Sequence, residues 1–585
     1  MRAAALVLVA LQLAVRGWVV FTGDFYWDDL ILISRSGHYP ALSAEFLFYD
    51  HDGHFMPAAF LVAWLSTAIA PLDWAVPAVT LLAAQALASL AVLRVLRLLL
   101  GNRPVVLVPL AFYLFVPLTL PSFAWWAAGL NSLPMQIGLA WVAGDAIRLC
   151  RTGRIRFAVS GALVAAVSLA FFEKSVLVPV TAFVVVALMF RVDGVDRPIR
   201  AAWTRGRSLW IPLAAVVAVW AGAYLFFTRS RLVLPSAEQT VGLVHHGTSL
   251  GLVPTLLGGP WSWDRWPPSP PWATPPLVLV VLGWVAVAAA VVWSLRYRQR
   301  TAGVWLAMLG YVAASEAAMV LTRSGPDTAY ELAQTLRYVS DSAVVIVLGW
   351  ALLVRAPRRP EVRPLPSPRP VLVGAVVVVF VASSLWSTVT FTERWRDNPT
   401  VDYLANGRAA LAADPDTPVL DQSVSIYVLL PVAYPHNTTS RIFGPLRERP
   451  EFARSTDRLQ LFDDTGHLVP AVVAPARNLG QGPVPGCGYR VEDVPVELPL
   501  DGPLLEWEWT AGLNYFASTD GDVEVSLNKG GDTVTVPVRA GLNQVFVRLI
   551  GAGDAVRVRA RTPGLAVCVG AGPVGSVVPA EGGTP

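Results

Sequence analysis

Two adjacent aspartates, Asp28 and Asp29, stand a few residues beyond the first apolar segment of the chain. A carboxylate beside a membrane can act as a general base, and paired carboxylates can bind a metal ion or lie next to a phosphate. If residues 24–29 were helical, Asp24 and Asp28 would share one face, because residues four apart are neighbours on a helix. The alternative is that these acidic side chains cap helices and remain solvated.

Other polar residues interrupt apolar sequence elsewhere. His54 ends a polar stretch in the same segment as the aspartates, and Glu173 with Lys174 separates two short apolar runs. Arg337 and Tyr338 stand where another apolar run begins. Charged groups among membrane spans are costly and are usually functional, and a guanidinium binds phosphate through two hydrogen bonds. Helix ends and snorkelling to the interface are the alternative explanations.

The composition indicates which elements must hold these residues. Of 585 residues, 54% are hydrophobic and only 15% are charged, with a mean hydropathy of +0.52. These values exclude an ordinary soluble enzyme, a disordered chain and a coiled coil. A net charge of +4 gives no reason to expect a nucleic acid partner.

Eleven apolar runs are long enough, or nearly so, to cross a bilayer as helices. The run 57–70 has about 14 residues and is expected to lie in the interface instead. The eleven predicted spans are 3–21, 74–98, 104–120, 131–149, 157–172, 175–190, 209–227, 276–295, 302–321, 338–355 and 371–391.

Arginine gives the orientation. Five connecting segments together hold 20 arginines, and the positive-inside rule places them in the cytoplasm. The N-terminus is then cytoplasmic, and the segments 22–73 and 228–275 are long external loops. The arginine-rich segments are 94–103, 148–156, 191–207, 296–300 and 355–369.

The remaining part, 392–585, is expected to be an extracytoplasmic soluble domain of mixed α/β structure. Alternating apolar and polar residues after about 490 predict half-buried strands, so 490–575 is expected to form a β-sandwich of the jelly-roll type. Such a domain can bind carbohydrate or serve only as packing. Cys487 and Cys568 bracket the strands, and an extracytoplasmic compartment permits a disulfide between them.

A first span followed at once by an external acidic pair resembles the GT-C superfamily. These are membrane glycosyltransferases that use polyprenyl-phosphate sugars, such as protein O-mannosyltransferases, aminoarabinose transferases and arabinosyltransferases. The resemblance covers 1–391 in layout and about 24–60 in sequence, where His54 to Pro57 occupies the place of a Lys-Pro-Pro-like segment. It implies that Asp28 or Asp29 is the catalytic base. Some relatives carry a further acidic motif in the second external loop, where 122–131 has no carboxylate here.

The resemblance implies transfer of a sugar from a polyprenyl-phosphate donor to a glycan, lipid or protein acceptor of the cell envelope. Asp28 or Asp29 would be the base, and Asp24, His54, Glu173, Lys174, Arg337 and Tyr338 would contact substrate. No cofactor is assigned, and the carboxylates leave a divalent metal ion open. The arginine bias and the spans favour a bacterial cytoplasmic membrane. Two other classes stay open, a transporter or lipid-carrier flippase and a non-catalytic cell-envelope assembly protein.

Topology provides the first test. An odd number of spans with a cytoplasmic N-terminus places the C-terminus outside. A reporter that is active only in the cytoplasm should therefore be silent when it is fused after residue 585. Strong activity of that fusion would contradict the orientation and place the soluble domain inside.

Overall fold

The computed structural model describes residues 1–229, 233–363 and 369–580, and the chain divides into two compact units, Met1–Asn398 and Pro399–Pro585. Each unit is described separately. Three short parts of the predicted segments fall outside the described residues: 230–232 of the loop 228–275, 364–368 of the loop 355–369, and 581–585 of the soluble domain.

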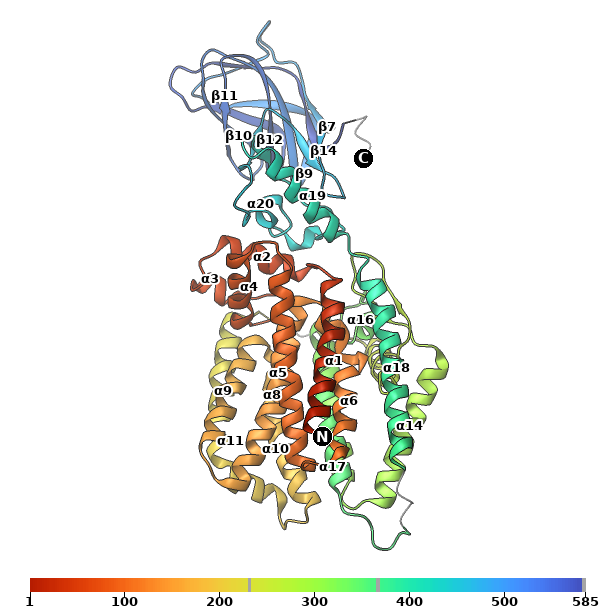
Figure 1. The fold of residues 1–585 in the computed structure, drawn as a ribbon. Coiled ribbons are helices and arrows are strands. Elements are labelled where there is room, and N and C mark those ends of the chain that lie inside the picture. The colour runs from red at the N-terminus through yellow and green to blue at the C-terminus, as the bar shows by residue number, and fades with distance from the viewer. Residues whose placement is uncertain (230–232, 364–368, 581–585) are drawn as a thin grey trace. The chain divides into compact units, whose positions relative to one another are not determined.

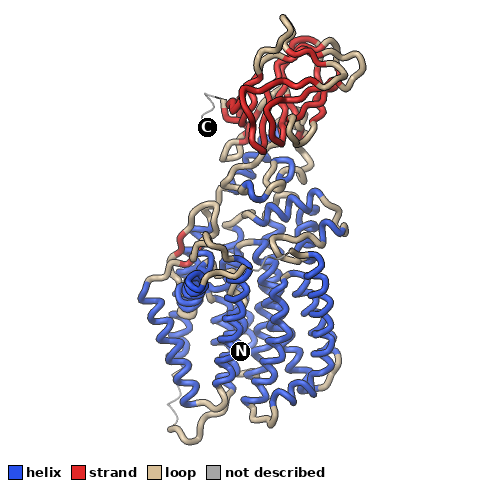
Figure 2. The backbone as a smooth tube through the Cα atoms, turned by 180° about the vertical axis from the view of Figure 1, so that it is seen from behind, coloured by secondary structure: helices blue, strands red, loops and turns tan. Residues whose placement is uncertain are grey.

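The first unit is helical, and helices occupy all eleven positions predicted for spans (Figures 1 and 2). The chain is a multispanning membrane protein. These helices are α1 (Arg2–Phe21), α5 (Ala75–Leu100), α6 (Leu107–Phe115), α8 (Trp126–Thr152), α9 (Arg156–Phe171), α10 (Leu177–Val192), α11 (Pro198–Phe227), α14 (Leu277–Tyr297), α15 (Ala302–Arg323), α17 (Ser342–Arg355) and α18 (Pro370–Trp395).

Not all of these helices could cross a bilayer alone. Within the described residues, seven helical segments are long and apolar enough to span, and one bent pair makes an eighth. The bent pair joins α6 to α7 (Leu120–Ala124) with a 41° change of direction. Pro117 begins the short turn between them, where a missing N–H and a fixed φ interrupt the helix. At 16 and 14 residues, α9 and α17 are shorter than the usual span.

The segment 22–73, predicted to be an external loop, forms three helices, α2 (Asp28–His38), α3 (Ala44–Leu47) and α4 (Pro57–Ile69), which lie together at one end of the helical bundle (Figure 1). Its 13 residues make α4 an apolar helix that is too short to span. The helix considered for 24–29 does not form, because Trp27 has a φ of 45° and α2 begins only at the next residue.

The second unit opens with α19 (Thr400–Ala413) and continues as a curled, ten-stranded sheet. The path β11-β10-β12-β9-β14-β7-β6 runs through it, and all its pairings are antiparallel. Alternate residues of the strands point into one apolar core. The path strands are β6 (Gln460–Phe462), β7 (Leu468–Leu479), β9 (Val496–Ala517), β10 (Gly521–Leu527), β11 (Val534–Val538), β12 (Gly541–Ala560) and β14 (Gly572–Pro579).

The sheet begins earlier than residue 490, because β6 and β7 belong to it. Pro470 and Pro475 weaken the sequence signal for a strand at β7, because proline has no backbone N–H to donate to a neighbouring strand. Pro475 is tolerated because it pairs with Gly575 where the register of β14 against β7 shifts, which is a position typical of a β-bulge.

The predicted disulfide between Cys487 and Cys568 is confirmed, with Cα atoms 4.8 Å apart. It anchors the loop before β8 (Tyr489–Val491) to β13 (Val567–Val569). Cys150 is a free cysteine in the other unit.

Removing this bond should destabilise the second unit. The bond closes a loop with a sequence separation of 81, for which chain entropy gives about 4 kcal/mol. We expect the Cys487→Ser/Cys568→Ser variant to lose about that much free energy of unfolding, measured by denaturant titration with proteolysis between 399 and 580 as the readout. Cys150→Ser is the matched control and should change nothing there. Equal stability of the double variant and the wild type would contradict the prediction.

Candidate functional site

Asp29 is fully buried and is held by backbone donors from two segments. The Tyr26 N–H donates to its Oδ2 at 3.0 Å, and the Ala127 N–H donates to its Oδ1 at 2.8 Å. Burial raises the pKa of Asp29 well above its usual range, although the two hydrogen bonds oppose this. Because Ala127 belongs to the first turn of α8, the Asp29 carboxylate ties the start of α2 to the start of α8.

Asp28 is placed differently. It is the first residue of α2, its side chain is 31% exposed, and its Oδ1 lies 3.8 Å from the Nε2 of buried His51. Burial lowers the pKa of His51, which favours the neutral imidazole. Trp27, just before Asp28, has the strained backbone that is often found at functional sites. Of the adjacent aspartates, Asp28 is therefore the one whose carboxylate a substrate can reach.

Arg337 faces Asp28. Its guanidinium lies 4.7 Å from the ring centre of Trp125 and 4.9 Å from that of Tyr338, and it donates to the Tyr338 hydroxyl at 2.8 Å. Burial lowers the pKa of Arg337, but Tyr338 and the Asp28 carboxylate outweigh burial, so the pKa is raised. The described residues place no carboxylate in an ion pair with Arg337. The half-buried cation is oriented by aromatic rings and is open to a phosphate.

Tyr26 connects this arginine to the segment 228–275. Its ring packs edge-on against Trp125 at 4.9 Å and Trp395 at 5.3 Å, and the Arg265 guanidinium lies 5.5 Å from its centre. The Tyr26 hydroxyl donates to the carbonyl of Pro268. Two residues of 228–275, Arg265 and Pro268, therefore contact Tyr26.

Two predicted residues, His54 and Glu173, are in contact. The Nδ1 of His54 lies 2.8 Å from the Oε1 of Glu173, which begins the short helix η3 (Glu173–Val176). The Nε2 of His54 lies 2.5 Å from a guanidinium nitrogen of Arg323, which also pairs with Asp52. The first loop, η3 and the end of α15 are joined in this way.

Lys174 is committed to partners within the protein. Its Nζ donates to the carbonyl of Tyr338 at 2.6 Å and to the Oδ1 of Asp341 at 2.7 Å. The Lys174 side chain is 9% exposed and that of Asp341 is 3% exposed. The other oxygen of Asp341 accepts from the Tyr311 hydroxyl. Lys174 thereby fixes the segment that carries Arg337.

The contacts join the candidate residues in two groups. Arg337 donates to the Tyr338 hydroxyl and Lys174 donates to the Tyr338 carbonyl, while His54 contacts Glu173. Asp24 lies before α2, where its Oδ1 accepts from the Phe25 N–H at 2.7 Å. In the described ranges, no group of three or more His, Cys, Asp or Glu side chains is close enough to hold a metal ion.

The sequence did not mark Tyr26, Trp125 and Arg265 as parts of this cluster. All three belong to segments rich in aromatic residues, and that enrichment was the available signal. Aromatic residues are also enriched at membrane interfaces, so composition alone does not distinguish aromatic residues that line a site from those that lie at the interface.

No protein-family model and no curated protein matched the sequence. Among solved structures, the chain is similar to arabinofuranosyltransferase AftD from Mycobacteria, at 12% identity and a TM-score of 0.38, over 98% of this chain and 59% of that chain. It is similar to ArnT from Cupriavidus metallidurans bound to undecaprenyl phosphate, at 13% identity and a TM-score of 0.34, over 77% of this chain and 89% of that chain. It is also similar to arabinosyltransferase EmbB from Mycobacterium smegmatis, at 13% identity and a TM-score of 0.30, over 98% of this chain and 64% of that chain. The chain spans less than two thirds of the length of AftD and EmbB.

Proposed function

We propose that the chain is a membrane glycosyltransferase that moves a sugar from a polyprenyl-phosphate donor to a cell-envelope acceptor on the outer face of the membrane. One observation carries the proposal. An accessible carboxylate, Asp28, lies close enough to a half-buried guanidinium, Arg337, to favour its charged form, and the described residues provide no ion-pair partner for Arg337. This arrangement offers a base for an acceptor hydroxyl and a cation for a leaving phosphate.

The proposed step is a displacement at the anomeric carbon. Asp28 takes the proton of the acceptor hydroxyl, and the oxygen forms the new bond to the anomeric carbon. The bond between that carbon and the donor's phosphate oxygen breaks, and the electron pair leaves with the phosphate. Arg337 stabilises the negative charge of the departing lipid phosphate. Attack from the side opposite the phosphate inverts the anomeric configuration.

The surrounding residues position these two groups. Trp125 and Tyr338 hold the Arg337 guanidinium between aromatic rings, and Lys174 fixes the backbone at Tyr338. His51 lies beside Asp28, where a neutral imidazole can share a hydrogen bond with the carboxylate or with the acceptor. We assign Lys174 to positioning, because both of its identified acceptors belong to the protein.

Arg337 provides the test of the proposal. The full chain in lipid nanodiscs should transfer sugar from at least one member of a panel of polyprenyl-phosphate sugars. Arg337→Ala should weaken donor binding and lower the rate about 10²–10³-fold, the range typical for loss of one charge-stabilising group. Arg337→Lys should recover only part of the activity, since an ammonium lacks the bidentate fork.

Arg103→Ala is the matched control, because Arg103 is an exposed arginine at the other end of the spans. It should keep wild-type transfer. Unchanged donor binding and rate in Arg337→Ala would reject the assignment. Movement of an intact lipid-linked sugar across the bilayer, with no transfer to any acceptor, would support the flippase class instead.

A further inference from the structure

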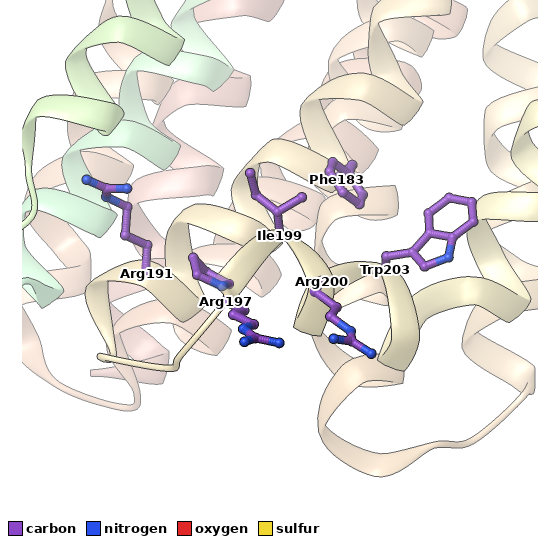
Figure 3. Close-up of a pocket in the computed structure, with 7 residues that line it drawn as sticks. Phe183, Arg191, Arg197, Ile199, Arg200 and Trp203 are labelled. Atoms are coloured by element: carbon purple, nitrogen blue, oxygen red, sulfur yellow. The ribbon is translucent and has the colours of Figure 1, made fainter.

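A hollow of about 630 Å³ lies between α10 and α11 (Figure 3). It is far from the proposed transfer site. Lys174 precedes α10 and Arg191 lies in its last turn, so the helix separates them by roughly 24 Å at 1.5 Å per residue. This is the arginine-rich end, predicted to be cytoplasmic. The hollow is lined by Phe183, Arg191, Arg197, Pro198, Ile199, Arg200 and Trp203.

Three exposed cations surround the hollow. Among the described residues, the side chains of Arg191, Arg197 and Arg200 are in no ion pair. Nearby Asp193 is already bound through both oxygens to Arg355, at 2.6 and 2.8 Å. The 30-residue helix α11 begins here, so its dipole adds positive potential. The site is therefore electropositive without an assigned counter-ion.

The remaining lining is apolar and continuous with a surface that must face lipid. Ile199 is 67% exposed and Trp203 is 52% exposed. Ile211, Val219 and Phe226 are also exposed further along α11, so this helix presents apolar side chains on more than one of its faces. Apolar side chains that are exposed along a spanning helix face acyl chains. The hollow thus places exposed arginines beside apolar surface that suits hydrocarbon.

We propose that this hollow binds an anionic phospholipid of the bilayer. The lipid phosphate lies at Arg197 and Arg200, whose side chains extend to the same side of the hollow (Figure 3), and an acyl chain packs against Ile199 and Trp203. A soluble phosphate would use the rim but would gain nothing from the exposed apolar face. The site is separate from the donor site, so it does not depend on the proposed function.

The test uses the full chain purified in detergent and mixed with equal amounts of phosphatidylglycerol and phosphatidylcholine. Native mass spectrometry then counts the lipids retained. The wild type should retain phosphatidylglycerol preferentially. Arg197→Gln/Arg200→Gln should weaken that retention about thirtyfold, since each surface arginine contributes about a factor of five to binding an anionic lipid. Trp203→Ala should also reduce retention although it keeps every charge.

Arg103→Gln/Arg154→Gln removes two exposed arginines at the same end outside the hollow and is the matched control. It should retain phosphatidylglycerol like the wild type. An equal loss in this control would show only a diffuse attraction and would overturn the proposal. Displacement of the lipid by an equal concentration of inorganic phosphate would overturn it in favour of a soluble anion. If the double variant melts before lipid is added, Arg200→Gln alone must still show a severalfold loss.

Discussion

Asp28→Asn should lower sugar transfer by about 10²–10⁴-fold, the usual effect of losing a general base, while folding and donor binding persist. The carboxylate is 31% exposed at the start of α2, so an amide of the same shape fits without a buried mismatch. Initial rates at saturating donor, together with donor affinity, measure the two effects separately.

Asp29→Asn is the matched control for this prediction. It should lower stability and not the rate of transfer, because both Asp29 oxygens are buried and accept hydrogen bonds from backbone N–H groups. An amide NH2 would face one of these donors, and a buried unpaired donor costs about 1–3 kcal/mol. We expect less folded protein, with near-normal activity in the folded fraction. Near-normal transfer by Asp28→Asn would contradict the proposed base. A loss confined to folded Asp29→Asn would move the role to Asp29.

The contrast between these neighbours shows where sequence reasoning ended. The acidic pair after the first span was visible in the sequence, but nothing local separates Asp28 from Asp29. Adjacent helical residues point about 100° apart, so only one of them meets the N–H of Ala127. That donor is 98 residues away in the sequence, on another helix. Packing therefore decides which of the two carboxylates is buried and which stays accessible.

The same distinction holds for the fold. Apolar runs predicted the positions of the helices, because the requirement for about 20 apolar residues acts locally. The bend between α6 and α7 and the strand β7 were not predicted. In both cases a proline stands where the regular element is interrupted. Pro117 begins the turn between α6 and α7, and Pro475 lies at the bulge in β7. Pairs like His54 with Glu173, 119 residues apart, likewise require the assembled bundle.

Lys174→Met should be strongly destabilising, which would distinguish a positioning lysine from a phosphate ligand. The variant leaves Asp341 buried without its cation, and breaking a buried pair from one side typically costs 3–5 kcal/mol. Thermal unfolding in nanodiscs measures the loss. Donor affinity should fall as well, because the Tyr338 carbonyl that Lys174 holds lies next to Arg337.

The second variant, Lys174→Met/Asp341→Asn, removes the uncompensated charge and keeps an oxygen that can accept from Tyr311. Replacing both members of a buried ion pair is often close to neutral, so most of the lost stability should return. Donor affinity should return with it if Lys174 acts only through the 338–341 segment. Restored stability with donor affinity still at the level of the single variant would mean that the ammonium itself contacts the phosphate, and the positioning role would be rejected.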